Sequence, residues 1–197
     1  MALGNTSNVL VGAPNVSGGF WVADKLAQAE IDALTGTTDL TADEKFHPVG
    51  FVSEDGITEA QERDTEKVKA WGGDTIRVLQ NEFTKTYSLT FMELKNVEVL
   101  KLIYGEGNVT EAADGSVAIR HNKDTLDHKT FVIDVLDRNE RVRKVIPNGQ
   151  ITETGELNLT HSAVMSLEIT IEAFIDEKGT NAYEFRVSAD GSDPENP

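Results

Sequence analysis

The sequence predicts a mainly β protein: an antiparallel β-sandwich or partial barrel with one α-helix packed outside it and a long loop between two strands. Two segments, 83–91 and 165–175, alternate apolar and polar residues with the period of two that marks a half-buried strand. A third segment, 92–104, has the composition of a helix, and a polar stretch at 54–74 separates two β-prone segments. No internal repeat divides the chain.

The N-terminal part of the chain predicts short elements. Residues 1–8 are small and polar, and we expect them to form a flexible N-terminal arm. Segments 9–12 and 19–22 are expected to be short strands on either side of a Pro-Asn turn. Trp21 in the second of these is assigned to the core, with a partner contact as the alternative. Residues 23–34 contain helix formers but only an irregular apolar stripe, which predicts a loop or a short helix.

The principal helix is predicted from its two ends. Thr90-Phe91-Met92-Glu93 matches a capping box, in which the first and last side chains satisfy free backbone N–H groups at a helix start. A helix over 92–104 would then stop at Gly105, in a left-handed C-cap. Its apolar residues surround most of the cylinder, so the helix should be covered on more than one side. Packing across the outer face of a barrel, and partly under a neighbouring subunit, would provide that cover.

The C-terminal half predicts several more strands. Segments 131–136 and 142–146 should pair as a hairpin, and the Pro-Asn-Gly sequence at 147–149 predicts a turn. The remaining strands are expected at 116–120, 151–160, 165–175 and 183–187, followed by an acidic disordered tail at 188–197.

Composition bounds the function classes. The chain has 197 residues, enough for one domain with a sizeable core. Its 34 acidic and 18 basic residues give a net charge of −16, which argues against tight, sequence-independent nucleic-acid binding. The absence of cysteine excludes disulfides and thiol chemistry. We find no secretory signal and no membrane anchor in the sequence.

The sequence shows no catalytic constellation. Its four histidines are scattered, and a metal site among His121, Asp124, Asp127 and His128 would need supporting residues that we do not find, so these are interpreted as surface loop residues. Neither a phosphate-binding glycine loop nor a nucleophile elbow is present. We therefore predict no enzyme, no catalytic, cofactor-binding or metal-binding residue, and no cofactor.

The polar stretch is the feature around which the chain is organised. An excursion of this length between strands, with no core of its own, is usually functional or disordered. It contains six acids and three bases and ends at Trp71, next to Gly72 and Gly73. Glycine lets the backbone turn sharply and tryptophan is a favoured interface anchor, so Trp71 is either a partner contact or a local lid over the core.

Several stretches resemble a known family. These are Gly-Phe-Val-Ser-Glu-Asp-Gly at 50–56, Lys-Ala-Trp-Gly-Gly-Asp at 69–74, the segment 96–105, and Val-Ile-Pro-Asn-Gly at 145–149. In their order and spacing they are similar to the major tail tube proteins of long-tailed, non-contractile phages that infect Gram-positive bacteria. The resemblance covers 9–187, which would be one tail tube β-domain with a stacking loop at 53–74.

The resemblance implies a structural virion protein, made in the host cytoplasm, whose hexameric rings stack into the tail tube and conduct the genome to the host. Its implied partners are further copies of itself and other tail proteins such as the tape measure and tail terminator, while genomic DNA passes without specific binding. The inter-ring contact is carried onto Glu54, Asp55, Glu59, Glu62, Arg63, Asp64, Glu66, Lys67, Lys69, Trp71, Gly72 and Gly73. A loop disordered in the free subunit would prevent premature assembly.

Two questions stay open from the sequence. Glu168 and Glu172 are candidate lumen-facing residues by alternation, but an ordinary solvent face is the alternative, and Arg77 and Lys85 speak against a wholly acidic lining. The alternative function is a monomeric or oligomeric β-sandwich binding module, such as a capsid decoration or carbohydrate-binding protein. That function would need an exposed aromatic platform, and the tryptophans and tyrosines are dispersed.

Overall fold

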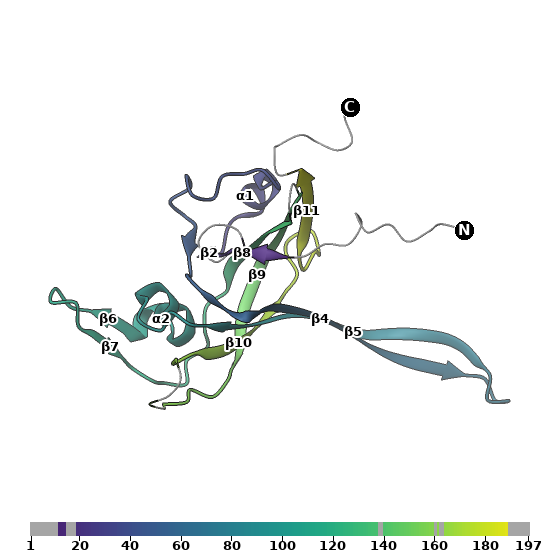
Figure 1. Cartoon of the computed structure of the whole chain (residues 1–197). Helices are drawn as coiled ribbons and strands as arrows, with labels where there is room; N and C mark the ends of the chain where they lie inside the picture. The colour runs from purple at the N-terminus through teal and green to yellow at the C-terminus, as the bar shows by residue number, and fades with distance from the viewer. Residues whose placement is uncertain (1–11, 15–18, 138–139, 160, 162–163, 189–197) are drawn as a thin grey trace.

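The computed structural model describes residues 12–14, 19–137, 140–159, 161 and 164–188 (Figure 1). This part of the chain is mainly antiparallel β-structure, which confirms the predicted fold class. Its elements in chain order are β1 (Ala13–Pro14), β2 (Phe20–Asp24), α1 (Gln28–Ala33), β3 (His47–Pro48), β4 (Val52–Lys69), β5 (Thr75–Phe91), α2 (Val97–Tyr104), a 3₁₀ turn (Glu106–Asn108), β6 (Val109–Glu111), β7 (Val117–Ile119), β8 (Lys129–Asp137), β9 (Glu140–Thr154), β10 (Leu167–Ala173) and β11 (Tyr183–Ser188).

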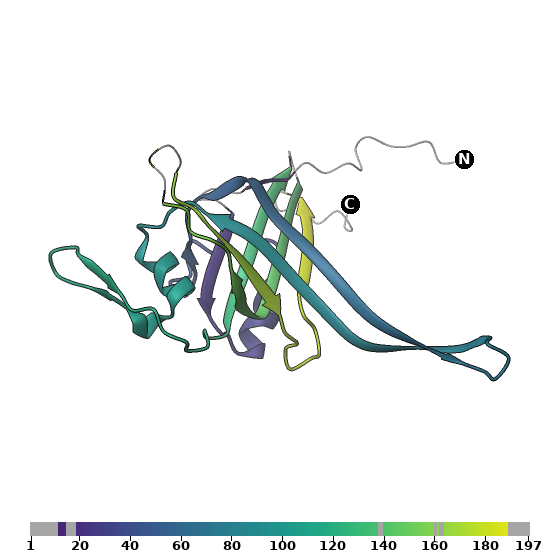
Figure 2. The same ribbon diagram turned by 90° about the horizontal axis from the view of Figure 1, so that it is seen from below.

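A 9-stranded antiparallel sheet forms the body, with the strand order β3-β2-β8-β9-β10-β5-β4. Strand β9 is central: one edge pairs with β8, while the other pairs with β11 near its start and with β10 near its end. Residues 49–51 connect β3 directly to β4, so the two ends of the strand order are joined by a short link. The curled sheet that results is the predicted partial barrel (Figure 2).

The short link depends on a glycine. Gly50 has a φ of +79°, which glycine adopts without strain, and a Cβ at this position would lie 2.2 Å from the carboxyl carbon of Glu93. The Glu93 Oε1 in turn accepts a hydrogen bond of 3.0 Å from the backbone N–H of Phe51. The carboxylate thus occupies the space left by the missing side chain and holds the start of β4.

The larger of two apolar cores lies inside the curled sheet. The Phe20 ring stacks on that of Phe131 with 5.8 Å between centroids and meets Phe91 edge to face at 6.1 Å, which joins strands from both ends of the strand order. The inward positions of β5 and β10 and the buried face of α2 complete this core. Apolar burial is the main favourable contribution to folding, so this cluster holds the body together.

A second core covers the other face of the sheet. Trp21 and Val132 pack there against Ile31 of α1. The predicted core position of Trp21 is therefore confirmed. Arg143 is also buried on this side: its guanidinium donates to Asp134 Oδ2 at 2.9 Å and to two backbone carbonyl oxygens of the segment that follows α1. A buried cation is tolerated because its donors find these acceptors.

The predicted capping box at Thr90 is wrong. β5 continues through Phe91, where Thr90 still pairs with Glu168, and Glu93 is bound to the backbone N–H of Phe51, just before β4, and not to a helix end. The helix α2 begins later, with Asn96 as the N-cap whose side chain accepts from the backbone N–H of Glu98 at 3.1 Å. It ends at Gly105 as expected, with positive φ but ψ of 139°, outside the left-handed helical region.

The turn predicted at 147–149 is also wrong, because β9 runs through it without interruption. The pairing register between β8 and β9 shifts here, and a register shift accommodates the missing N–H of Pro147. Gly149 is needed because a Cβ would lie 2.6 Å from the ring of Phe131. The strand predicted at 151–160 accordingly ends at Thr154 as the tail of β9.

Other expectations are confirmed with shorter bounds. β7, β10 and β11 lie within or beside the predicted strands, the hairpin of β8 and β9 is present, and α1 is the short helix. Ser188, assigned by prediction to the tail, is the last residue of β11. The arm 1–8, the N-terminal part of the strand at 9–12 and tail residues 189–197 lie outside the described residues. No helix in the described part is long and apolar enough to cross a membrane.

The largest difference concerns the long loop, which is a β-hairpin. β4 and β5 pair almost to their ends, with register shifts at three points along β4 (Figures 1 and 2). The prediction failed because a strand with solvent on both faces needs no apolar alternation, so polar composition alone does not exclude it. The expectation of a disordered loop is therefore replaced by a paired structure that extends from the body.

Candidate assembly site

The distal half of the hairpin is entirely exposed. Every residue from 60 to 78 is exposed to solvent, and the Trp71 side chain is fully exposed at the turn. Trp71 is therefore not a lid over the core. Ile76 and Val78 on β5 are also apolar, and their exposed fractions are 66% and 54%. Large apolar side chains that are exposed on a protruding element are typical of an interaction site.

The part of the hairpin next to its turn, residues 67–79, is basic in an acidic protein. Between 67 and 79, Lys67, Lys69 and Arg77 oppose the single carboxylate of Asp74, a local charge of +2 in a chain of net charge −16. None of these three cations forms an ion pair or a side-chain hydrogen bond in the described part of the chain. The tip thus presents apolar surface and unpaired positive charge together.

The turn that carries Trp71 has defined geometry. Gly73 has a φ of +92°, and its N–H donates to the carbonyl oxygen of Ala70 at 2.9 Å. The Ala70 N–H donates to the carbonyl oxygen of Asp74 at 2.8 Å. The positive φ of Gly73 therefore belongs to a hydrogen-bonded turn, and this turn presents Trp71 at the far end of the molecule.

A chain of ion pairs fixes the base of the hairpin to the body. The Glu59 carboxylate of β4 binds Lys85 of β5 and, at 2.5 Å, Lys144 of β9; Lys144 also binds Glu184 of β11 at 2.6 Å. Burial alone would raise the pKa of the Glu59 carboxyl, but the two ammonium groups outweigh it and lower this pKa to about 2. The network holds four strands in one orientation, so the hairpin leaves the body in a defined direction.

Lys85 does not lie on the face of the sheet that carries the candidate lumen-facing residues, against which the sequence analysis had weighed it. It lies on the side of β5 that carries Tyr87, with its ammonium group 5.5 Å from the centre of that ring, and its charge is balanced by Glu59. Burial, followed by the nearby charges of Glu59 and Glu184, raises the pKa of the Tyr87 hydroxyl. Lys85 therefore does not contribute to the opposite face of the sheet.

That opposite face holds the candidate lumen-facing residues. In β10 the side chains of Leu167, Ile169 and Ile171 are buried in the core, so Glu168 and Glu172 point away from it. The register sets these glutamates beside hydroxyl-bearing residues: Glu168 opposite Thr90, Thr170 opposite Ser88, Glu172 opposite Thr86, Thr58 opposite Ser88 and Glu62 opposite Thr84. These positions of β4, β5 and β10 form an acidic and hydroxyl face without a cation.

Comparison with known proteins gives the family. A family model described as phage tail tube protein matches residues 1–193 of the chain. The chain belongs to this family. It is a structural subunit of a phage tail tube and hence a component of the virion, and the family role is structural and not enzymatic. No curated protein matches the tail tube protein.

Several solved structures are similar to this tail tube protein. The tail of an empty gene transfer agent particle, refined with C6 symmetry, is 14% identical over 86% of this chain and 93% of that one, with a TM-score of 0.40. The sheath–tube complex of an extracellular contractile injection system is 14% identical over 94% and 99%, with a TM-score of 0.40. The baseplate of the anti-feeding prophage is 11% identical over 91% and 99%, with a TM-score of 0.38.

The structure divides the residues predicted for the inter-ring contact into four groups. Glu54 and Asp55 are exposed at the base of β4, and Glu59 belongs to the ion-pair network. Arg63 lies 4.5 Å from the centre of the Phe83 ring and donates to Gln80. The remaining members lie on exposed β4 or in its turn: Glu62, Asp64, Glu66, Lys67, Lys69, Trp71, Gly72 and Gly73.

Sequence reasoning missed candidate site residues on the partner strands. Ile76 and Val78 could have been found, because they alternate along a β-prone segment next to the turn. Arg77 was assigned to the lumen question, whereas it belongs to the distal hairpin. No local sequence pattern marks Lys144 or Glu184. Lys144 meets Glu59, and Glu184 meets Lys144, only because the strands pair in the folded chain.

The possible metal residues do not come together. In the described part of the chain no three His, Asp or Glu side chains form a group that could hold a metal ion. The His121 ring packs edge to face on Tyr104 at 4.8 Å, and the His128 ring packs on Phe174 at 5.1 Å. Asp124 accepts a hydrogen bond from Asn122.

Proposed function

We propose that this tail tube protein builds the tube of a long-tailed, non-contractile phage of a Gram-positive host by stacking hexameric rings, and that the β4–β5 hairpin carries the contact between rings. The observation that supports this most is the combination of full exposure, apolar side chains and unpaired cations at the end of a fixed hairpin. A surface of this kind is stable in an assembled protein when a partner covers it. Other tail proteins, such as the tape measure and tail terminator, would bind the ends or interior of the tube.

A hairpin that leaves one side of the body favours a head-to-tail contact. Such a contact uses two different surfaces of the same chain, and repeats into an open filament instead of closing as a pair. The ion pairs at Glu59 keep the hairpin in one orientation, so the loss of conformational freedom on assembly is small. Rigidity at the base and exposure at the tip together suit a subunit that must stack many times.

The acidic and hydroxyl face is the proposed lining of the lumen. DNA carries about one negative charge per 1.7 Å of its axis, so a surface without cations repels phosphates while its hydroxyls stay hydrated. Glu168 and Glu172 lie on this face with Glu62 and the threonines of β5. The genome would therefore slide through to the host without binding. In this proposal the domain limits are an arm at 1–8, a tube domain that runs from 9 to the end of β11 at Ser188, and a tail at 189–197.

The stacking proposal is tested with the purified full chain. Negative-stain microscopy and sedimentation velocity of the concentrated protein should show rings and tubes. Trp71→Ala should leave soluble subunits or single rings, whereas Leu159→Ala, at an exposed leucine of the body, should still form tubes. A wild-type protein that stays monomeric at high concentration would overturn the proposal and favour the binding-module alternative.

The lumen proposal needs a separate measurement. Glu168→Lys together with Glu172→Lys should still form tubes, but in phage these tubes should retain DNA and reduce the titre of infective particles. Glu177→Lys, an exposed site in the turn after β10, serves as a control for charge reversal outside this face and should change neither. Equal titres for the double variant and the wild type would show that these glutamates do not line the path of the genome.

A further inference from the structure

We infer that the cavity between β2–β3 and α2 is the socket that receives the hairpin tip of the next copy of this chain. This inference rests on the proposed stacking through the hairpin and assigns the surface on which the hairpin docks. It concerns a cavity of about 470 Å³, within the range of about 300–1,000 Å³ that encloses ligands of moderate size. The cavity is referred to below as the α2 cavity.

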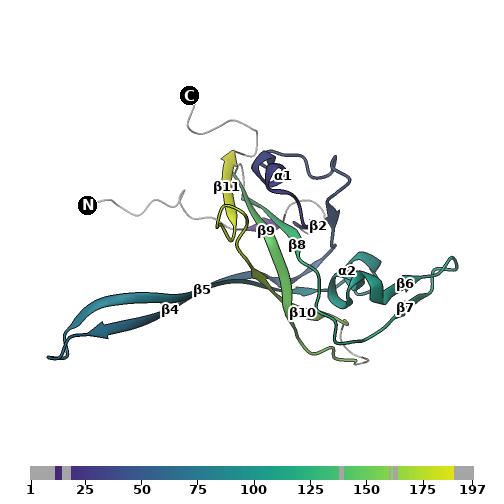
Figure 3. The ribbon, with the colours of Figure 1, turned by 180° about the vertical axis from the view of Figure 1, so that it is seen from behind.

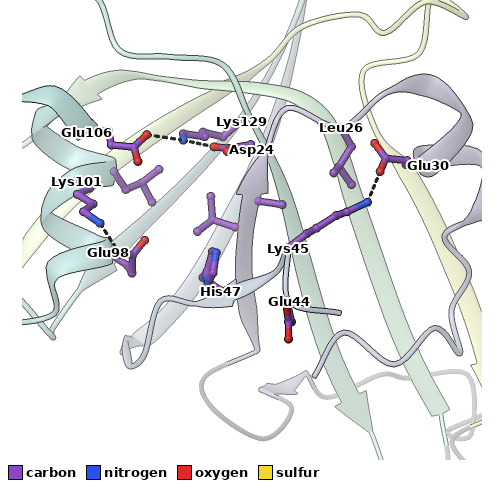
Figure 4. Close-up of a pocket in the computed structure, with 13 residues that line it drawn as sticks. Asp24, Leu26, Glu30, Glu44, Lys45, His47, Glu98, Lys101, Glu106 and Lys129 are labelled. Carbon is purple, nitrogen blue, oxygen red and sulfur yellow. Dashed lines mark hydrogen bonds and ion pairs between the residues drawn. The ribbon is translucent and has the colours of Figure 1, made fainter. Parts of the chain in front are cut away.

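The α2 cavity combines an apolar floor with an acidic rim (Figure 4). Val22, Leu26 and Leu102 supply apolar surface from β2, the segment before α1, and α2. The rim carries five carboxylates against three lysines, a net charge of −2 with His47 neutral; the carboxylates belong to Asp24, Glu30, Glu44, Glu98 and Glu106. A partner that brings a large aromatic ring for the apolar floor and cations for the acidic rim would match this combination.

The lysines of the rim are already engaged. Lys45 binds Glu30, Lys101 binds Glu98 at 2.9 Å, and Lys129 binds Asp24 at 2.5 Å with Glu106 at 3.9 Å (Figure 4). Glu44 forms no side-chain hydrogen bond or ion pair in the described part of the chain. The surplus negative charge is therefore open to a partner that brings cations.

The hairpin tip offers what the cavity lacks. Lys67, Lys69 and Arg77 have no partners within the described residues, and Trp71 stands between the two strands that carry them. Trp fills apolar pockets well, and complementary charges around a pocket fix the register of a contact more than its strength. The occupant that we assign to the α2 cavity is thus the Trp71 turn of a second copy, with its cations on the acidic rim.

The positions of the two surfaces fit a head-to-tail repeat. The hairpin leaves the body on one side, and α2, one wall of the cavity, lies on the other side together with β6 and β7 (Figures 1 and 3). A translated copy would bring its tip to the α2 side of its neighbour, and that neighbour's own tip would stay free for the next. This arrangement extends without limit, as a tube requires.

A competing cavity of about 620 Å³ lies at the base of the hairpin itself, where Phe51, Ile57 and Val135 line it. Three of its four charged groups already have partners, since Glu59 and Lys144 bind each other and Asp134 binds Arg143, while the fourth, Glu54, is exposed. This cavity is on the side from which the hairpin leaves, so a tip from a translated copy would not face it. Insertion there would need a reversed copy, and a reciprocal pair of that kind closes instead of growing.

Cysteine cross-linking can separate the two cavities, because the chain has no cysteine of its own. Gly72→Cys places a thiol in the turn, where the nearest atom to an added Cβ is 3.9 Å away, so the change is tolerated. It is combined with Glu44→Cys on the α2 cavity or with Glu54→Cys on the competing one; both positions are exposed glutamates. Assembled tubes of each double variant are treated with a short bifunctional maleimide and analysed on denaturing gels.

The expected result is a ladder of covalent oligomers for Gly72→Cys with Glu44→Cys, and only monomer for each single variant and for the pair with Glu54→Cys. Tubes that cross-link through Glu54→Cys, or through neither position, would overturn the socket while stacking itself stands. If the wild-type protein forms no tubes at all, the proposed stacking fails and the socket fails with it. Formation of tubes by the wild type is scored first, so these failures are distinguished.

A charge exchange gives a second measurement. Glu44→Lys should raise the protein concentration needed for assembly roughly tenfold, since an attraction becomes a repulsion at the rim. Adding Lys69→Glu to the same chain should recover most of that loss. Neither position is buried, so the monomer should stay folded, as circular dichroism would show. Two losses that simply add, with no recovery, would contradict contact between the tip and this rim.

Discussion

The two halves of β5 share one strand but have opposite surroundings. Near its end, Tyr87, Leu89 and Phe91 are buried in the core, whereas near its start Ile76 and Val78 are as apolar but lie in solvent. Burial of apolar groups stabilises the fold only where partners of the same chain cover them. The comparison teaches that one half of the strand stabilises the subunit, while the other half, which the proposed function assigns to assembly, contributes little to folding, so substitutions in the two halves should affect different measurements.

The largest expected effect is on folding, in the buried half. Phe91→Ala removes a ring that contacts Phe20 and should reduce the free energy of unfolding by about 3–5 kcal/mol. Chemical denaturation at a concentration below that of assembly measures this loss. Val78→Ala in the exposed half is the control and should stay within about 0.5 kcal/mol of the wild type. Equal losses in both variants would remove the distinction between the halves.

A smaller loss of folding stability is expected at Gly50, in the link that precedes β4. Gly50→Ala places a side chain at a φ of +79° and against the Glu93 carboxylate, and should cost about 2 kcal/mol of folding stability. Thermal or chemical unfolding measures it. Gly107→Ala, where nothing lies within 4 Å of the added Cβ, should be nearly neutral. A stable Gly50→Ala protein would mean that the link from β3 to β4 can take another path.

The ion-pair network should contribute about 1–2 kcal/mol to the free energy of unfolding, after allowance for screening by solvent, and this contribution should depend on pH. The folded pKa of Glu59, about 2, lies below its ordinary value of 4.5. The contribution of the ionised Glu59 to the free energy of unfolding is therefore complete at pH values above 4.5. It is lost as the pH falls through the pKa of about 2 in the folded protein. The stability difference between wild type and Glu59→Gln should shrink from about pH 5 to about pH 2.5. A difference independent of pH, or one equalled by Glu54→Gln, would contradict the network.

The smallest effect on folding is expected at Trp71. Its side chain is fully exposed, so Trp71→Ala should change the free energy of unfolding by less than about 0.5 kcal/mol while it abolishes tube formation. Denaturation and electron microscopy on one preparation measure both. Trp21→Ala is the informative opposite, because Trp21 is buried in the second core and its loss should unfold the protein. A Trp71→Ala protein that still assembles would move the anchor of the contact elsewhere.

Sequence reasoning succeeded where one face of an element is buried. The alternation at 83–91 and 165–175 correctly oriented Tyr87 and Ile169 inward, because burial on one face imposes the period of two. It failed for the distal hairpin, where neither face is buried and the pattern disappears. The capping box failed at Glu93 because a distant backbone N–H, that of Phe51, competes for the same carboxylate. Such long-range partners are set by the folded sheet and leave no local pattern.

The candidate site divides in the same way. The stretch that contains Trp71 was found from its length and composition, which need no tertiary information. The network of Glu59, Lys144 and Glu184 joins residues as far as 85 positions apart and depends on the strand order. The α2 cavity likewise combines four separate segments of the chain. Charge can be counted from a sequence, but the place where opposite charges meet is a property of the fold.

The continuity of β5 has a mechanical consequence. A single strand joins the turn proposed to contact a neighbour to Phe91, whose ring packs on Phe20, so a load applied at the turn would act on the body as through a lever arm. In a stacked filament each subunit would feel a shift of the one below it as torque about the Glu59 ion pairs. The bending stiffness of the whole tail would then be set by that one joint, repeated in every layer.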